Sequence, residues 1–291
     1  MREHKENPLT EVPDGDAQTN AAKAIVRNDQ KSELGSAKAD SSTPLRPSLA
    51  GRLRYYWSLF AAAMLLLIFA PPSLLVAWLA GRRELVYPVA RWGAKTWLRL
   101  SGVKVIVRGR GQLDARQTYV FISNHRSYLD TATLFYHTGR RIGILAKKEL
   151  LKVPILGYGM GYVNIMAIDR SNRQRAIETV RAATERIRSG VSFGVFAEGT
   201  RALPGQFLRF KKGAFYMAIE AGVPIVPVAM KNTDALMGKG TGQARPGTME
   251  MVLLSPIETK EFAKEEDVGR LISDVHSRIA EELAVPVIET R

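Results

Sequence analysis

The chain has 291 residues, enough for one large domain or two small ones, so the size of its core is not limiting. It contains no cysteine, which excludes disulfides, thiolate nucleophiles and cysteine-ligated metal sites. The net charge is +14, and residues 1–50 carry 7 basic and 8 acidic side chains, so the basic excess lies in residues 51–291. A basic region of this kind suits nucleic acid, an anionic bilayer or a phosphorylated substrate.

The composition divides the chain into three segments. Residues 1–50 are rich in Ala, Ser, Asp, Lys and Pro without a sustained apolar period, which predicts a disordered N-terminal tail. No basic stretch followed by an apolar run opens the chain, so we expect no cleaved signal peptide. We expect a membrane-associated helical segment over residues 51–102 and an α/β domain over residues 103–291.

Residues 55–80 are almost wholly apolar and are interrupted by the pair Pro71-Pro72. The run is long enough to cross a bilayer as one kinked helix, but the proline pair favours two short helices joined by a turn. Both flanks are positively charged, through Arg52, Arg54, Arg82 and Arg83. Positive charge at both ends predicts a membrane-embedded helical hairpin with both ends cytoplasmic, and a buried helix of a soluble domain is the alternative.

Alternating strand-like and helix-like patterns begin at residue 103, after an amphipathic helix predicted over 84–101 that suits either a membrane interface or packing on a sheet. Amphipathic helices are also predicted over 173–189 and 261–284. The predicted strands are Val103–Val107, Tyr119–Ser123, Ile142–Ala146, Val163–Ile168, Ser192–Phe196, Ile225–Met230 and Thr248–Leu254. This order predicts an α/β fold with a central mixed, largely parallel sheet flanked by helices. Two prolines in the segment Val223 to Val228 favour an edge strand or a strand start there.

The sequence Asn-His-Arg-Ser-Tyr-Leu-Asp at residues 124–130 joins a predicted strand to a predicted helix. Inside one helix, five residues correspond to about 140° of rotation, so His125 and Asp130 meet only if His125 precedes the helix and Asp130 lies in its first turn. In that arrangement a neutral histidine accepts a proton from a hydroxyl group while the carboxylate orients the ring. Alternatively, Ser127 and Asp130 form a capping box and Asp130 has a purely structural function.

Two arginines also follow predicted strands. Arg170 ends the segment Ile-Asp-Arg, and Arg201 ends Glu-Gly-Thr-Arg, in which a positive φ angle is expected at Gly199. Each segment alone fits a solvated charge or an ordinary turn. Together with His125 at the same edge of a parallel sheet, the two guanidinium groups would suit a phosphate monoester, with Thr200 and the Gly199 amide as further donors.

The ordered segments NHRSYLD, IDR, FAEGTRA and VPIVPV resemble the four sequence blocks of the glycerolipid acyltransferases, most closely the 1-acyl-sn-glycerol-3-phosphate acyltransferases, over residues 55–285. The resemblance implies that His125 is the general base and Asp130 its orienting carboxylate. It implies acceptor binding by the second and third blocks and by a basic residue that follows, which here are Arg170, Glu198, Gly199, Thr200, Arg201 and Lys211. The fourth block, around Pro227, is implicated in binding the acyl donor, and Ala167 departs from the large residue common in the second block.

The implied reaction moves a fatty acyl group to the sn-2 hydroxyl of lysophosphatidic acid and makes phosphatidic acid for phospholipid biosynthesis. The co-substrate would be acyl-CoA or acyl-acyl carrier protein, without a metal or another cofactor. The expected partners are a lysophospholipid acceptor and an anionic membrane, not nucleic acid, at the cytoplasmic face of a bacterial-type inner membrane. The alternatives are another lysolipid acceptor such as lyso-ornithine lipid, a hydrolase, which the absence of G-x-S-x-G disfavours, or a non-enzymatic basic membrane-binding protein.

Overall fold

The computed structural model describes residues 47–262 and 265–284, so most of the predicted N-terminal tail lies outside the described residues. Seven strands form one sheet: β1 (Val103–Arg108), β2 (Val120–Ser123), β3 (Ile142–Lys147), β4 (Ile165–Ile168), β5 (Ser192–Phe196), β6 (Ile225–Lys231) and β7 (Gly247–Leu253). Their order across the sheet is β1-β7-β6-β2-β5-β3-β4, and every neighbouring pair is parallel except β6 and β7. The predicted mixed, largely parallel sheet is confirmed.

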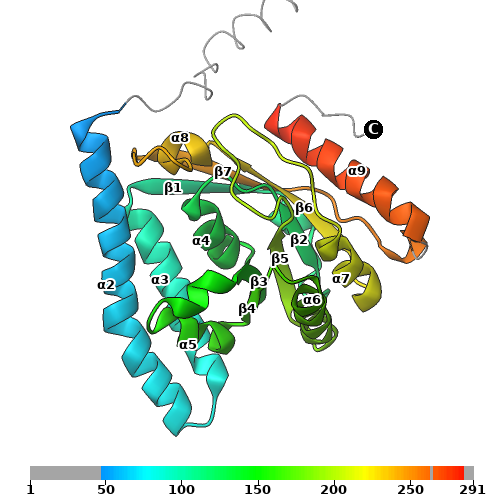
Figure 1. Ribbon diagram of the computed structural model, residues 1–291, viewed down its shortest axis with the longest axis horizontal. Helices are drawn as coiled ribbons and strands as arrows, with labels where there is room; N and C mark the ends of the chain where they lie inside the picture. Colours follow the sequence, from blue (N-terminus) through cyan, green and yellow to red (C-terminus); the bar gives the residue numbers. More distant parts are fainter. Residues whose placement is uncertain (1–46, 263–264, 285–291) are drawn as a thin grey trace, which may run out of the picture. The chain divides into compact units, whose positions relative to one another are not determined.

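Helices cover both faces of the sheet (Figure 1). One face carries α2 (Leu49–Leu79), α3 (Val86–Leu100), α4 (Tyr128–His137) and α5 (Leu156–Met160), and the other carries α6 (Arg173–Arg188), α7 (Gly213–Ala221) and α9 (Glu265–Leu283). Shorter helical segments are α8 (Thr233–Met237), η1 (Arg83–Leu85), η2 (Arg110–Gln112), η3 (Lys148–Lys152), η4 (Gly161–Val163) and η5 (Lys260–Phe262). Strands β2 and β5 are buried along their full length, as expected for parallel strands covered on both faces.

Strand β6 is central, between β7 and β2, so the expectation of an edge strand for the proline-containing segment is wrong. Ile225 exchanges backbone hydrogen bonds with Ile257, and two residues further the Pro227 carbonyl accepts from the Leu254 amide at 2.9 Å. Pro227 therefore faces the connection that follows β7, because the β6–β7 ladder begins only at Val228. The missing N–H of Pro227 removes no ladder bond, which explains how a central strand accommodates it.

Helix α2 runs without a break from Leu49 to Leu79 and contains Pro71 and Pro72, so the prediction of two short helices joined at the prolines is wrong. Ser73 follows the pair and donates from its hydroxyl group to the Ala70 carbonyl at 2.8 Å. Proline lacks the N–H that bonds the carbonyl four residues earlier, so Pro71 and Pro72 free the carbonyls of Leu67 and Ile68, while the helix continues through both residues. The chain instead turns after Ala80, and α3 returns antiparallel beside α2 (Figure 1).

The N-terminal half of α2 is fixed to α3 by polar side chains. The Trp97 indole donates to the Ser58 carbonyl at 2.8 Å, and the Ser58 hydroxyl lies 2.7 Å from the Ser101 hydroxyl. The Trp57 indole donates to the carbonyl of Leu100 at 3.0 Å. These contacts make α2 and α3 one antiparallel hairpin that packs against the sheet through α3.

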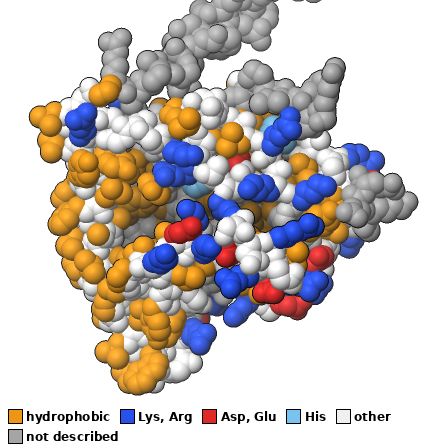
Figure 2. All heavy atoms as spheres, in the orientation of Figure 1, with side chains coloured by type: hydrophobic (Ala, Val, Ile, Leu, Met, Phe, Trp, Pro, Cys, Tyr) orange, Lys and Arg blue, Asp and Glu red, His pale blue; other side chains and the backbone are white. Residues whose placement is uncertain are grey.

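The outer side of α2 is apolar and exposed, which contradicts the alternative of a buried helix. Of the described helices, α2 is the one long and apolar enough to cross a membrane, and only 11% of its most apolar 18-residue window is buried. Its exposed side chains include Leu67, Ile68, Leu75, Val76 and Trp78. Figure 2 shows hydrophobic side chains gathered on the left, where α2 lies, and Lys and Arg side chains across the middle and right. An apolar surface of this kind marks an interaction site.

Candidate active site

His125 and Asp130 meet at the junction between β2 and α4. His125 lies in the connecting loop and Asp130 in the first turn of α4, and His125 Nδ1 lies 2.9 Å from Asp130 Oδ2. The same carboxylate oxygen accepts hydrogen bonds from the amides of Arg126 at 2.7 Å and Ser127 at 2.8 Å. Asp130 is fully buried, whereas the His125 side chain retains 16% of its exposure. The pairing occupies Nδ1 and leaves Nε2 as the ring nitrogen that can accept a proton.

Asp130 also caps α4. Ser127 is the N-cap residue, its hydroxyl group accepts from the Leu129 amide at 3.2 Å, and its own amide is bound by Asp130. The structure therefore contains both arrangements that the sequence left open, because one carboxylate oxygen serves the helix cap and the imidazole together.

The His125 loop is bonded to the loop that follows β5. The His125 amide donates to Glu198 Oε1 at 3.1 Å, and the His125 carbonyl accepts from the Ala202 amide at 2.7 Å. The His125 ring stacks on Phe196, with centroids 4.0 Å apart and planes inclined by 18°. Backbone bonds on both sides and a ring beneath the imidazole hold His125 in one orientation.

Glu198 is buried beside this pair. Burial raises the pKa of Glu198 from 4.5 to about 8, while the hydrogen bond from the His125 amide and the positive charge of Arg126 act in the opposite direction. The carboxyl group is therefore mostly protonated at neutral pH. Glu198 consequently supports the backbone of His125 without adding a full second negative charge near Asp130.

Arg201, at the end of the third sequence block, and Lys211 form a positively charged rim beside the loop that carries His125. Gly199 has a φ angle of 73°, as expected, but its amide donates to the Phe196 carbonyl at 3.0 Å and is used within the turn. Lys211 folds over Gly199, since a Cβ atom at that glycine would lie 2.7 Å from Lys211 Cε. Thr200 is exposed, and the Arg201 guanidinium lies over the ring of Tyr128.

Arg170 and Pro227 lie apart from this group. Arg170 follows β4, which is three strands from β2, so the two strand ends are about 14 Å apart along the same edge of the sheet. The neighbouring Asp169 pairs with Lys148 at 2.7 Å and with Arg175 at 3.7 Å. Pro227 is buried in β6 beside Ile122. A substrate contact by either residue stays a prediction.

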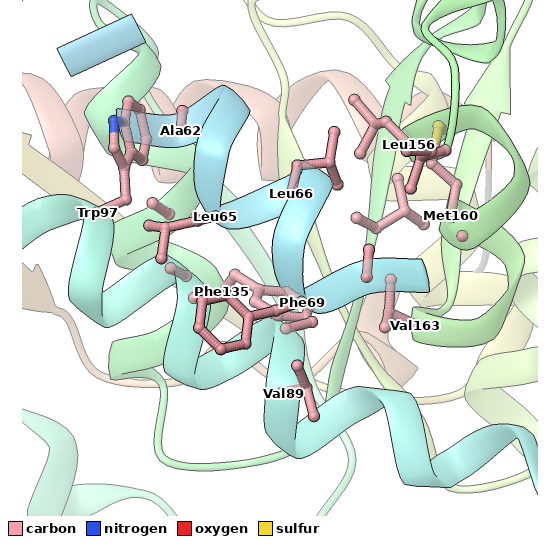
Figure 3. A pocket seen from close by; sticks show the side chains of 18 of the residues that line it. Ala62, Leu65, Leu66, Phe69, Val89, Trp97, Phe135, Leu156, Met160 and Val163 are labelled. Atoms are coloured by element: carbon pink, nitrogen blue, oxygen red, sulfur yellow. The ribbon is translucent and has the colours of Figure 1, made fainter. Parts of the chain in front are cut away.

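An apolar cavity of about 490 Å³ begins beside the loop that carries His125, where Tyr128 forms part of its wall. Its wall includes Tyr128, Thr131 and Ala132 from the first turns of α4, and it continues between α2, α3 and α5. Figure 3 shows side chains from these helices converging on the cavity, among them Leu65, Phe69, Val89, Trp97, Phe135 and Met160. Its volume is in the range typical of small-molecule sites, roughly 300–1,000 Å³.

Sequence reasoning missed three contributors to the site. Tyr128 lies within the first block, but nothing in the sequence indicated a contact with Arg201. Phe196 was predicted only as the end of a strand. Lys239 lies far along the chain, yet its ammonium group donates to the Arg201 carbonyl at 2.5 Å and its amide to the Arg126 carbonyl at 3.2 Å. In the part of the chain that the structure describes, no group of three His, Asp or Glu side chains is arranged to hold a metal ion.

Comparisons with known proteins relate the chain to acyltransferases. A family model described as "Acyltransferase" matches residues 104–231. The chain is 35% identical over 185 residues to the 1-acyl-sn-glycerol-3-phosphate acyltransferase of Saccharomyces cerevisiae, covering 62% of this chain and 60% of that protein. It is 35% identical over 182 residues to the 1-acyl-sn-glycerol-3-phosphate acyltransferase alpha of Bos taurus, covering 62% of this chain and 63% of that protein. The matches thus span about three fifths of the length of these curated relatives.

The fold is also similar to a solved structure. The crystal structure of the 1-acyl-sn-glycerophosphate (LPA) acyltransferase PlsC from Thermotoga maritima matches with a TM-score of 0.69 and 27% sequence identity. The match covers 81% of this chain and 97% of that one.

Proposed function

We propose that the chain transfers a fatty acyl group from a thioester to the sn-2 hydroxyl of lysophosphatidic acid, starting from the match of residues 104–231 to the family model described as "Acyltransferase". The product would be phosphatidic acid. The observation that carries the proposal is the hydrogen bond of 2.9 Å between His125 and buried Asp130. Both the apolar cavity and the basic rim lie beside the loop that carries this pair. The names of the relatives support lysophosphatidic acid as acceptor.

The chemistry follows from the free nitrogen of His125. Nε2 accepts the proton of the acceptor hydroxyl while the oxygen attacks the thioester carbonyl carbon. The C–O bond forms, the tetrahedral intermediate collapses, and the C–S bond breaks. The sulfur leaves with the proton that the imidazolium returns, and Asp130 stabilises the imidazolium in between. The thioester is supplied by coenzyme A or by acyl carrier protein, and no metal or other cofactor enters the scheme.

The acceptor is held by its anionic end. Arg201 and Lys211 line the rim beside the catalytic loop, and a guanidinium group binds phosphate oxygens through parallel N–H donors. In our proposal Arg170, at the same sheet edge, assists from the side of β4. Glu198 supports the loop from below, and Thr200 is exposed next to Arg201.

The acyl chain occupies the apolar cavity. Tyr128 and Thr131 line the end of the cavity nearest His125 and belong to the same part of α4 as Asp130. An acyl chain within the cavity would therefore end near His125. The cavity wall includes residues of α2, the helix with the exposed apolar side. This arrangement gives a lipid tail a route between a membrane and the catalytic loop.

Helix α2 also indicates how the protein meets a membrane. Arginines lie near both ends of the helix, Arg52 and Arg54 in its first turns and Arg82 after its end, and polar contacts fix its inner side to α3. We therefore propose that α2 lies along an anionic bilayer surface, with its exposed apolar side in the acyl region and its charged ends at the headgroups. The proposed location is the cytoplasmic face of a bacterial-type inner membrane.

An acyl-transfer assay across acceptors and donors tests the function. We expect the purified protein to acylate lysophosphatidic acid, and a His125→Ala variant to lose at least about a hundredfold in kcat with an unchanged melting temperature, because it lacks the base. Activity near the wild-type level in His125→Ala would remove His125 from the mechanism. Thioester cleavage without an acceptor would favour a hydrolase.

The acceptor series distinguishes the remaining alternative. Preferred turnover of a phosphate-free lysolipid such as lyso-ornithine lipid would keep the chemistry and overturn the acceptor. Bilayer binding without any acyl transfer would support a non-enzymatic membrane protein instead.

A further inference from the structure

The position of Arg201 is defined by an aromatic ring. The carbon at the centre of its guanidinium group lies 3.6 Å from the centroid of Tyr128, whereas the other cation–ring pairs among the described residues span 4.8 to 6.0 Å. Tyr128 is the first residue of α4 and remains 44% exposed. The pair is thus closely stacked and open to solvent on one side.

Among the described residues, Arg201 forms no ion pair with a carboxylate. A carboxylate partner would occupy the N–H donors of the guanidinium group, whereas a ring occupies only its flat face. Stacking on Tyr128 therefore restricts the side chain and keeps its in-plane donors available to an anion.

The backbone of Arg201 is fixed independently. Its carbonyl accepts from Lys239, and the next amide, that of Ala202, donates to the His125 carbonyl. The peptide is thus held against the catalytic loop, while the long side chain has the Tyr128 ring as its support. Tyr128 also lines the apolar cavity, so its ring stands between the cavity and the guanidinium group.

We propose that Tyr128 is a positioning residue that holds the Arg201 guanidinium group at the mouth of the apolar cavity, ready to bind the acceptor phosphate. The proposal rests on the function proposed above and adds a residue to it. An arginine that is already ordered loses less side-chain entropy when it binds phosphate. Removing the ring therefore weakens acceptor binding and leaves proton transfer at His125 unchanged.

A double-mutant cycle tests the proposal with Tyr128→Leu, Tyr128→Phe, Arg201→Ala and the Tyr128→Leu/Arg201→Ala double variant. Leucine keeps an apolar cavity wall but removes the ring, and phenylalanine keeps the ring. We expect Tyr128→Leu to raise the acceptor KM about 5- to 30-fold with kcat within about twofold, and Tyr128→Phe to restore the wild-type KM within about twofold. The melting temperature should change little.

The double variant measures whether the two side chains act together. We expect Tyr128→Leu to add no increase in acceptor KM when Arg201 is already alanine, because no guanidinium group remains to be held. An equal increase in both backgrounds, or a loss of kcat with an unchanged KM, would overturn the positioning role. If Arg201→Ala weakens the acceptor and Tyr128→Leu does not, this inference alone fails. A wild-type protein that does not acylate lysophosphatidic acid would overturn the proposed function itself.

Discussion

A single oxygen atom of Asp130 organises the loop that carries His125. It accepts from the imidazole of His125 and from two consecutive backbone amides, those of Arg126 and Ser127. Because the cap and the orienting contact use the same atom, the start of α4 and the direction of the imidazole are fixed together. The sequence contained both patterns, but their coexistence depends on where the His125 backbone turns, and residue types alone do not encode that.

Glu198 provides a prediction at the same scale. Its pKa is 4.5 in the unfolded chain and about 8 in the folded one, so the folded protein retains a proton that the unfolded chain releases between these pH values. This contribution to stability is fully present below pH 4.5 and is lost as pH rises to 8, by an amount on the order of 5 kcal/mol. A Glu198→Gln variant keeps an acceptor for the His125 amide but has no proton to lose.

We therefore expect the variant to gain stability relative to wild type as pH increases from 5 to 8. Denaturant unfolding of both proteins at several pH values measures the difference in the free energy of unfolding. A difference that stays constant over this range would contradict a buried, protonated carboxyl group.

At the scale of elements, the apolar pattern of the sequence predicted neither the helix boundaries of α2 nor the position of the cavity. The run at residues 55–80 predicted a membrane-associated segment. The turn predicted at Pro71-Pro72 is absent, because the helix continues through both prolines and loses only the backbone bonds that these two residues cannot donate. The hairpin instead uses α3 as its second arm. The sequence did not predict the cavity, because its wall combines four α-helices, the short segments η3 and η4, and two strands.

Ala132 offers a way to shorten that cavity. It lies in α4 one helical turn beyond Tyr128, is 8% exposed and lines the cavity. An Ala132→Leu variant adds three carbon atoms there, so we expect kcat/KM for the longest acyl donors to fall about tenfold relative to short donors. Ala182→Leu, at an exposed position of α6, is the matched control. An unchanged chain-length profile would place the acyl chain outside this cavity.

At the scale of the whole molecule, the sequence predicted the strands but not their order. The seven predicted strands all occur, most with ends shifted by a residue or two. Because the strands before them are parallel, His125, Arg170 and Arg201 lie at one edge of the sheet, as predicted. How far apart they lie depends on strand order, and two other strands separate β4 from β2. Local patterns define strands, whereas their neighbours come from distant segments, so the approach of Lys239 to Arg201 was beyond prediction.

The apolar side of α2 gives a prediction for the molecule as a whole. Ile68 and Leu75 are 58% and 55% exposed, and neither lines the cavity. We expect an Ile68→Asp/Leu75→Asp double variant to lose about tenfold or more in affinity for anionic vesicles, because two apolar side chains no longer enter the acyl region. Co-sedimentation measures the affinity, and Ile177→Asp on α6 is the control. Binding as tight as that of wild type would show that α2 is not the contact.

The bond between Lys239 and Arg201 has a consequence for biosynthesis. Among the described helices and strands, α2 is translated first, whereas the rim beside His125 is complete only when residue 239 has left the ribosome. The ribosome therefore releases the apolar helix α2 well over a hundred residues before it releases Lys239, which the proposed active site needs to be complete. If α2 contacts the membrane as proposed, that contact can form before the proposed active site is complete.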